Sequence, residues 1–224
     1  MDERYIRNIP AITEEEQIAL KNKRILIVGC GGLGGFLLEN MIRLGVGEIT
    51  AVDGDCFESS NLNRQLLSTV EVLGTPKAVA ARERAAAVNP NVHVISVHAL
   101  LDESNASELV RGQDLVLDAL DNVSSRLLLE DECERQNVPM IHGAIQGWNA
   151  QAATVLPGSH LLHRLYGSGE GSFSKSALAF TPAFCAAVES AEALRLLCGR
   201  PAMLAGKLLL ADLLRMNWDV IPLD

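Results

Sequence analysis

The sequence predicts a doubly wound α/β fold whose sheet is mainly parallel and carries a C-terminal antiparallel extension. Short continuous apolar runs, typical of strands buried on both faces, recur along the first two thirds of the chain. Segments with helical spacing separate these runs, so strand and helix alternate. A chain of 224 residues is long enough for one large core and too short for two full domains, so we expect a single domain over residues 1–224.

The first elements follow from capping signals and apolar runs. A capping box from Thr13 to Glu16 predicts a helix within an N-terminal arm, residues 1–22. Pro76 suits the first turn of an Ala-rich helix that ends near Asn89. The strands expected in the core, residues 23–150, are 24–29, 48–53, 92–97, 114–119 and 139–144.

After residue 150 the pattern changes. A Gly/Ser-rich stretch, 158–176, predicts a loop, and a helix is expected from about Pro182 to Cys198. Two closing strands are expected near 206–212 and 215–222. Residues 151–224 should therefore add a mixed-sheet extension to the same domain.

The composition excludes several classes of partner. The net charge is −9 and the isoelectric point is about 5.1, so the chain lacks the basic footprint that DNA or RNA binding requires. The N-terminal segment lacks the apolar core of a secretory signal, and the longer apolar stretches are too short to cross a membrane. These features predict a cytoplasmic protein without a membrane partner.

The cysteines indicate reduced thiols. They are odd in number, scattered and never arranged as C-x-x-C, which fits the cytosol and a packing role for most of them. They are Cys30, Cys56, Cys133, Cys185 and Cys198.

The expected first strand runs into a G-x-G-x-x-G motif that opens a helix. Gly29, Gly31 and Gly34 form the motif, and its glycines let backbone N–H groups approach a phosphate at the helix N-terminus. Asp53 closes the second strand roughly 20 residues later, where a carboxylate accepts hydrogen bonds from ribose hydroxyls. We expect a Rossmann-like adenine-nucleotide site; the bland alternative is a glycine turn that serves only strand–helix packing.

Polar residues beyond Asp53 favour ATP over NAD. Hydride transfer needs no such concentration of charge, whereas a triphosphate attacked at its α-phosphorus needs cations, and a carboxylate for Mg²⁺. Most of them follow the carboxyl ends of parallel strands and should converge. The residues are Asp55, Asn61, Arg64, Gln65, Lys77, Asp121, Asn122 and Arg126.

Each of these residues also has a plainer interpretation. Arg64 suits a solvated loop cation, and Lys77 suits the first turn of a helix. Asp121 and Asn122 suit the N-cap of the next helix. Together with the glycine loop, the set favours a nucleotide site.

The strings RY-x-R, GCGGLG, D-x-D, SNLNRQ, PK and LDN-x3-R resemble, in order and spacing, the ThiF/MoeB/HesA family of ubiquitin-activating-like adenylyltransferases. This resemblance implies a ubiquitin-activating-like fold, a homodimer, and transfer of AMP from ATP to a carboxylate. It implies that Asp121 binds Mg²⁺ and that Arg7 enters the neighbouring subunit's active site. The residues it matches to the ATP site are Gly32, Asp53, Asn61, Arg64, Lys77 and Asp121.

The chain departs from that family in its cysteines. Many members hold Zn²⁺ with two C-x-x-C pairs, whereas this chain has His160 and His163 at the place of the first pair. Two histidines do not fill a four-ligand zinc shell, so no zinc site is expected. The crossover stretch Gly167–Ser176 lacks a cysteine, and Cys185 lies on an apolar helix where a thiol is inert.

The expected substrate is the C-terminal Gly-Gly carboxylate of a small ubiquitin-like sulfur-carrier protein, activated for thiocarboxylate formation. The loop 158–176 is expected to cover the activated carboxyl group or to guide the carrier's tail. Three alternatives stay open: adenylylation of a small molecule, peptide or modified tRNA nucleoside, an NAD-dependent dehydrogenase, and a non-catalytic scaffold.

Overall fold

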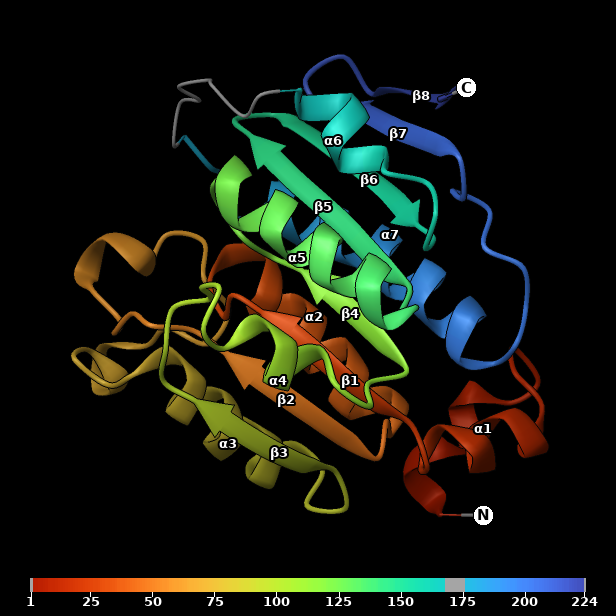
Figure 1. Ribbon diagram of the computed structural model, residues 1–224. Coiled ribbons are helices and arrows are strands. Elements are labelled where there is room, and N and C mark those ends of the chain that lie inside the picture. Colours follow the sequence, from red (N-terminus) through yellow and green to blue (C-terminus); the bar gives the residue numbers. More distant parts are fainter. Residues whose placement is uncertain (1, 168–175, 224) are drawn as a thin grey trace.

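The computed structural model describes residues 2–167 and 176–223 (Figure 1). One eight-stranded sheet runs through the molecule in the order β3-β2-β1-β4-β5-β6-β7-β8. Its strands are β1 (Arg24–Val28), β2 (Glu48–Val52), β3 (His93–Val97), β4 (Leu115–Asp118), β5 (Met140–Gln146), β6 (Asn149–Val155), β7 (Lys207–Asp212) and β8 (Asn217–Pro222).

The helices connect and flank these strands. The α-helices are α1 (Glu14–Leu20), α2 (Gly32–Leu44), α3 (Lys77–Val88), α4 (Ala106–Val110), α5 (Val123–Gln136), α6 (Leu161–Tyr166) and α7 (Phe180–Leu197). The 3-10 helices are η1 (Glu3–Asn8), η2 (Ser59–Asn61) and η3 (Val70–Val72).

The sheet confirms the expected fold class. The pairs β1–β2, β1–β4, β2–β3 and β4–β5 are parallel, whereas β5–β6, β6–β7 and β7–β8 are antiparallel. The strand order reverses between β1 and β4, where the crevice of an open α/β sheet forms at the carboxyl ends of the strands.

Alternate residues of each buried strand face opposite layers, as the two-residue period of a strand requires. Ile25 and Ile27 join one apolar cluster with α2, α3 and α7. Leu26 and Val28 join a second cluster with α4, α5 and α6. Helices therefore cover both faces of the parallel strands (Figure 1).

Most predicted helix ends are confirmed, with small shifts. Thr13 caps α1 through a capping box. Pro76 is the N-cap of α3 rather than a residue of its first turn. The helix α7 begins at Phe180, so that Pro182 lies inside its first turn, where its missing N–H is harmless.

The predicted loop 158–176 is wrong for its first half, because α6 occupies Leu161–Tyr166. Glu130 of α5 accepts hydrogen bonds from the backbone N–H groups of Leu162 and His163 at 2.7 and 2.9 Å. This carboxylate caps a six-residue helix from a distant part of the chain, so local sequence gave no signal. Residues 168–175 of the predicted loop lie outside the described residues.

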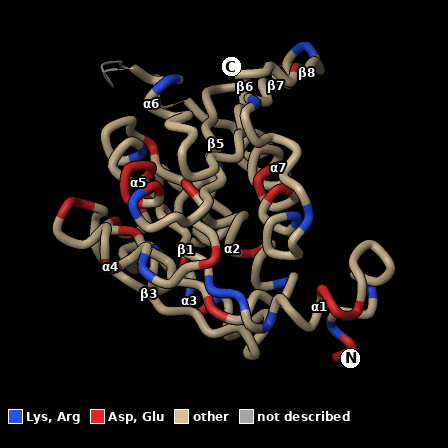
Figure 2. The backbone as a smooth tube through the Cα atoms, turned by 45° about the vertical axis from the view of Figure 1, so that its right-hand side comes forward, with Lys and Arg blue, Asp and Glu red and all other residues tan. Residues whose placement is uncertain are grey.

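Charge is spread over the surface. Figure 2 shows acidic and basic residues interspersed along α5. Within residues 2–167 and 176–223, no helix combines the length and the apolar character needed to cross a membrane. Cys30, Cys133 and Cys185 are buried, as expected for most of the cysteines, whereas Cys56 is exposed.

Candidate active site

A cavity of about 1010 Å³ lies at the carboxyl ends of β1, β2 and β4, at the point where the strand order reverses. A cavity of this size accommodates a nucleotide and part of a second substrate. Most of the site residues expected from the sequence line it: Gly29, Gly31, Gly32, Asp53, Asp55, Arg64, Gln65, Lys77, Asp121 and Asn122.

The glycine loop follows β1 and opens α2. Gly29 has φ +95°, and a Cβ atom there would lie 2.5 Å from the carbonyl oxygen of Ala119. A Cβ atom at Gly34 would lie 1.7 Å from the carbonyl oxygen of Gly29, so this glycine permits close packing of helix and loop. Gly31 is the N-cap of α2 and makes no side-chain capping bond. The first N–H groups of α2 therefore suit an anionic ligand.

Asp53 links the glycine loop after β1 to the segment after β2 through hydrogen bonds. Its carboxylate accepts hydrogen bonds from the backbone N–H of Cys30 at 2.7 Å and of Asp55 at 2.8 Å. A carboxylate offers about four lone pairs, so Asp53 retains acceptor capacity for ribose hydroxyls.

Lys77 is a cation fixed by its neighbour. It is the first residue of α3 and is buried, and its Nζ donates a hydrogen bond to Asp55 Oδ2 at 2.8 Å. An ammonium group has three donors, so two hydrogens of Nζ are available to phosphate oxygens.

Arg64 and Gln65 approach from the segment that follows η2. Arg64 Nη1 donates hydrogen bonds to the Ser60 carbonyl oxygen at 3.0 Å and to Asn63 Oδ1 at 2.9 Å. Gln65 is buried, and its Oε1 has no hydrogen-bond partner among the described residues. A buried amide oxygen without a partner costs free energy, which a donor on a bound ligand would remove.

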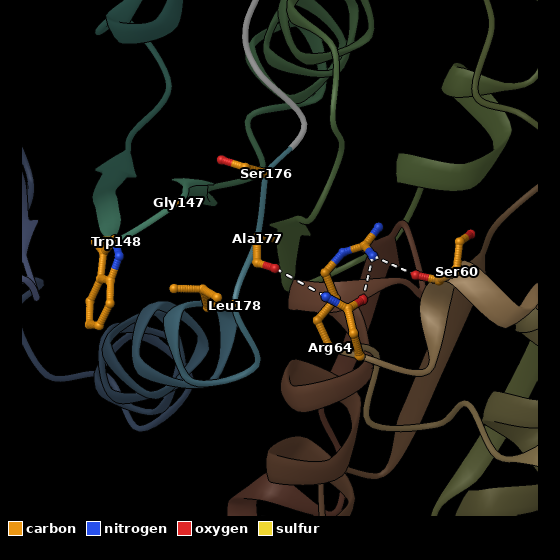
Figure 3. A pocket seen from close by; sticks show the side chains of 8 residues that line it. Ser60, Arg64, Gly147, Trp148, Ser176, Ala177 and Leu178 are labelled. Carbon is orange, nitrogen blue, oxygen red and sulfur yellow. Dashed lines mark hydrogen bonds between the residues drawn. The ribbon is translucent and has the colours of Figure 1, made fainter.

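A second cavity of about 480 Å³ adjoins the first at Arg64, which lines both (Figure 3). In Figure 3, Leu178 and Trp148 lie on the far side of Ala177 from Arg64, whose guanidinium group is turned toward Ser60. Asn63 Nδ2 donates a hydrogen bond to the Ala177 carbonyl oxygen at 3.2 Å across the two walls. The lining residues are Ser60, Asn63, Arg64, Gly147, Trp148, Ser176, Ala177 and Leu178.

Asp121 and Asn122 follow β4. Asn122 caps α5 by accepting a hydrogen bond from the Ser125 N–H at 2.9 Å, which is the plainer role considered above, and it also lines the cavity. Within the described residues no three acidic, histidine or cysteine side chains cluster as metal ligands. Mg²⁺ needs only one or two carboxylates beside substrate phosphates and waters, so Asp121 alone fits that ion.

Three expected residues lie elsewhere. Asn61 is buried within its own turn, where Oδ1 accepts a hydrogen bond from the Glu58 N–H at 3.0 Å. Gly34 lies against Gly29 behind the loop. Arg7 is exposed on η1, at the opposite end of the sheet from the cavity (Figure 1).

The sequence gave little sign of a polar network behind the cavity. This network consists of Asp118, His142, Gln151, Tyr166 and Arg126. Gln151, Tyr166 and Arg126 also line the cavity. Burial lowers the pKa of His142 despite the Asp118 carboxylate, and burial raises the pKa of Tyr166. A histidine within an otherwise apolar strand was the one available signal, and Tyr166 gave none.

His160 and His163 contact acidic residues of α5. His163 Nε2 lies 2.8 Å from Asp131 Oδ1, and His160 Nε2 lies 4.0 Å from Glu134 Oε1. Burial raises the pKa of the Cys185 thiol well above its usual range, which agrees with the inert thiol expected there.

Comparisons with known proteins agree with this geometry. The ThiF family model matches residues 3–224. The SAMP-activating enzyme E1 of Haloferax volcanii is 35% identical, covering 98% of this chain and 84% of its own. The molybdopterin-synthase adenylyltransferase of Salmonella typhimurium is also 35% identical, covering 88% and 82%.

Solved structures share the fold. A crystal structure of Escherichia coli MccB with ATP superposes with a TM-score of 0.83 at 20% identity, covering 100% of this chain and 71% of that one. The family match over nearly the whole chain, together with relatives that align over most of their own length, leads to one conclusion: the chain belongs to the ThiF family.

Proposed function

We propose that the chain transfers AMP from ATP to the C-terminal Gly-Gly carboxylate of a small ubiquitin-like sulfur-carrier protein. One carboxylate oxygen attacks the α-phosphorus, and the bond from that phosphorus to the oxygen bridging to the β-phosphate breaks. The products are an acyl-adenylate and pyrophosphate. Support comes from relatives named sulfur carrier protein adenylyltransferase and molybdopterin-synthase adenylyltransferase.

The observation that carries the proposal is the convergence of the glycine loop, the cations Arg64 and Lys77, and the carboxylate of Asp121 on one cavity. Arg64 and Lys77 neutralise phosphate charge that develops as pyrophosphate leaves. Asp121 holds Mg²⁺, and Asp53 and Gln65 hold the ribose. Catalysis rests on positioning and electrostatics, without a protein nucleophile.

The smaller cavity is the proposed route for the carrier's tail. Arg64 lines both cavities, so a chain lying along the smaller one ends beside the phosphates. Gly147 and Ala177 have little or no side chain, so they leave room along this route for an extended Gly-Gly terminus. The expected guiding role of residues 158–176 stays a prediction.

An apolar surface continues from that cavity and is the proposed docking face for the carrier's body. Trp148 is 40% exposed and packs on Phe180, with ring centroids 4.9 Å apart. The ring centroid of Phe184 lies 6.4 Å from that of Trp218, a residue of β8 that is 53% exposed. Exposed aromatic side chains of this kind mark protein-binding sites.

The proposed enzyme is a homodimer in which Arg7 of one subunit completes the active site of the other. Tyr5 is buried and its hydroxyl accepts a hydrogen bond from Asn89 Nδ2 at 2.8 Å, so the segment before α1 is anchored while Arg7 is exposed. An arginine supplied in trans stabilises transition-state charge.

ATP–pyrophosphate exchange tests the function. The purified chain with Mg²⁺ should catalyse exchange only when a Gly-Gly-terminated carrier from the same genome is present. Arg64→Ala should reduce the exchange rate roughly 100-fold or more, as loss of a transition-state charge contact does. Arg82→Ala, which removes an exposed arginine on α3, should leave the rate unchanged.

Other outcomes separate the alternatives. Exchange that needs a peptide, small molecule or tRNA instead of a carrier would replace the proposed substrate. ATP binding without exchange under any condition would indicate a scaffold, and preference for NAD over ATP would indicate a dehydrogenase.

A further inference from the structure

A buried polar relay runs from the sheet to the wall of the larger cavity, and the roles proposed above leave it unused. Asp118, at the end of β4, and His142, on β5, are both fully buried, and Asp118 Oδ2 lies 2.7 Å from His142 Nδ1. His142 Nε2 lies 3.0 Å from the hydroxyl oxygen of Tyr166. Tyr166 is the last residue of α6 and lines the cavity.

Donor and acceptor capacities set the direction of these hydrogen bonds. A carboxylate only accepts, so His142 Nδ1 donates to Asp118. Burial lowers the pKa of His142, which keeps the ring neutral and leaves Nε2 as an acceptor for the Tyr166 hydroxyl. The hydroxyl oxygen then accepts hydrogen bonds from Gln151 Nε2 at 2.6 Å and from Arg126 Nη1 at 3.2 Å.

Arg126 is the end point of the relay. Nη2 donates hydrogen bonds to the carbonyl oxygens of Leu120 and Gly143, and Nε lies 3.4 Å from Asp118 Oδ2. One hydrogen of Nη1 points to Tyr166. The other hydrogen of Nη1 makes no hydrogen bond within residues 2–167 and 176–223, and neither does Nε, which is buried; the side chain lines the cavity. A guanidinium held at three of its five N–H groups has a fixed orientation, so the remaining Nη1 hydrogen points in a fixed direction.

The position of Arg126 separates it from the other cations of the cavity. Among the described residues, the cavity-lining cations are Arg64, Lys77 and Arg126. Arg64 and Lys77 belong to the segment between β2 and β3, whereas Arg126 lies between β4 and β5 and contacts Gly143 of β5. Arg126 therefore places positive charge on the β5 side of the cavity, apart from Arg64 and Lys77.

We propose that Arg126 binds the substrate's carboxylate before the attack on ATP, and that Tyr166 and His142 are positioning residues that hold Arg126 for it. The proposal rests on the proposed function, because it names the group that receives the second substrate. No proton or bond changes hands within the relay: Arg126 stays protonated, and the hydrogen bonds fix its direction.

The relay is tested by half-saturation values in the exchange assay with the full chain, Mg²⁺ and the carrier. Tyr166→Phe removes one oxygen and frees Nη1 of Arg126. The carrier concentration for half-maximal exchange should rise roughly tenfold, the factor expected for loss of one hydrogen bond to a charged group, while that for ATP changes less than about twofold. His142→Asn should have the same effect on both half-saturation values. The Asn amide group can still donate a hydrogen bond to Asp118, as Nδ1 does, but it is too short to accept one from the Tyr166 hydroxyl.

Two further measurements separate positioning from a structural effect. In the Tyr166→Phe background, His142→Asn should add no further loss, since His142 acts through the tyrosine hydroxyl. Thr154→Val is the control, because it removes a buried side-chain hydroxyl that donates a hydrogen bond to Glu192 Oε2 at 2.8 Å and does not line the cavity. Thr154→Val should lower the melting temperature and leave both half-saturation values unchanged.

The proposal is overturned if Tyr166→Phe leaves the carrier concentration for half-maximal exchange unchanged, or raises the ATP concentration for half-maximal exchange by the same factor. It is also overturned if the effects of Tyr166→Phe and His142→Asn add. If His142→Asn does not fold, the two half-saturation values of Tyr166→Phe decide the question. Absence of exchange by the unaltered chain would remove the proposed function as well, whereas normal exchange with unchanged half-saturation values removes only the relay.

Discussion

At the scale of single residues, the structure combines charged groups that are paired with neighbouring groups of opposite charge and ionisable groups that burial keeps neutral. Lys77 is compensated by Asp55, and its hydrogen bond to that carboxylate leaves two donors for a ligand. Glu189 on α7 is fully buried, and its Oε2 has no hydrogen-bond partner among the described residues. Burial, and next the Asp118 carboxylate, raise the pKa of Glu189 well above its usual range.

Glu189 should make the chain less stable as the pH rises. An unfolded glutamate ionises near pH 4.3, whereas folded Glu189 retains its proton, so stability is fully present below about pH 4.3 and is lost as the pH rises toward the folded pKa. Glu189→Gln should therefore gain stability relative to the unaltered chain between pH 5 and pH 8, measured by urea unfolding. Identical pH dependence in both proteins would contradict the buried neutral carboxyl group, and Glu103→Gln on the surface is the control.

The sequence predicted the residues that line the larger cavity better than the polar network behind it. Gly29, Asp53 and Lys77 lie in local patterns whose spacing alone places them at strand ends. Tyr166 reaches the cavity only because α6 packs on α5, a contact between segments far apart in the chain. Asn61 lies close in sequence to residues that line the cavity, but its side chain accepts a hydrogen bond from the Glu58 N–H within the turn of η2.

At the scale of elements, α6 is the helix that depends most on tertiary contacts. It has six residues, too few for stability alone, and its N-terminal N–H groups are satisfied by Glu130 of α5. The strands were predictable because continuous apolar runs reflect burial on both faces. This helix was not, because its cap comes from another element.

Removal of the cap should displace the helix and its tyrosine together. Glu130→Ala leaves one buried and one part-buried N–H group without acceptors, and the expected loss in free energy of unfolding is about 2 kcal/mol. The carrier concentration for half-maximal exchange should also rise, since Tyr166 ends this helix. Urea unfolding and exchange kinetics check the two effects, with Glu134→Ala, which removes an acceptor at Gly158, as the comparison. An equal loss of carrier affinity in both variants would argue against α6 as the element that places Tyr166.

At the scale of the whole molecule, the parallel half and the antiparallel half of the sheet serve different substrates in this account. Strands β1, β2 and β4 end at the larger cavity, proposed to bind ATP, while β5 to β8 carry the apolar face proposed for the carrier. Arg7 belongs to neither, because η1 lies at the opposite end of the sheet (Figure 1). The role proposed for Arg7 therefore requires a second copy of the chain.

Subunit complementation tests this requirement. Arg7→Ala and Arg64→Ala should each lose exchange activity as separate homodimers. When the two variants are mixed and allowed to exchange subunits, mixed dimers should regain activity, because one of their two sites has both arginines. Mixing the Arg7→Ala variant with a Lys77→Ala variant should give the same recovery, because each mixed dimer again has one site with all of its residues. No recovery despite demonstrated subunit exchange would place Arg7 outside the active site.

The most direct test of the central claim is to follow the phosphates of ATP in the presence of the chain, Mg²⁺ and the carrier. With ATP labelled at the α-phosphate, the label should appear on the carrier as an acyl-adenylate that hydroxylamine releases as AMP; with ATP labelled at the γ-phosphate, it should appear only in pyrophosphate. Transfer of the γ-phosphate label to the carrier, or release of the α-phosphate label without any carrier, would contradict adenylylation of the carrier's carboxylate.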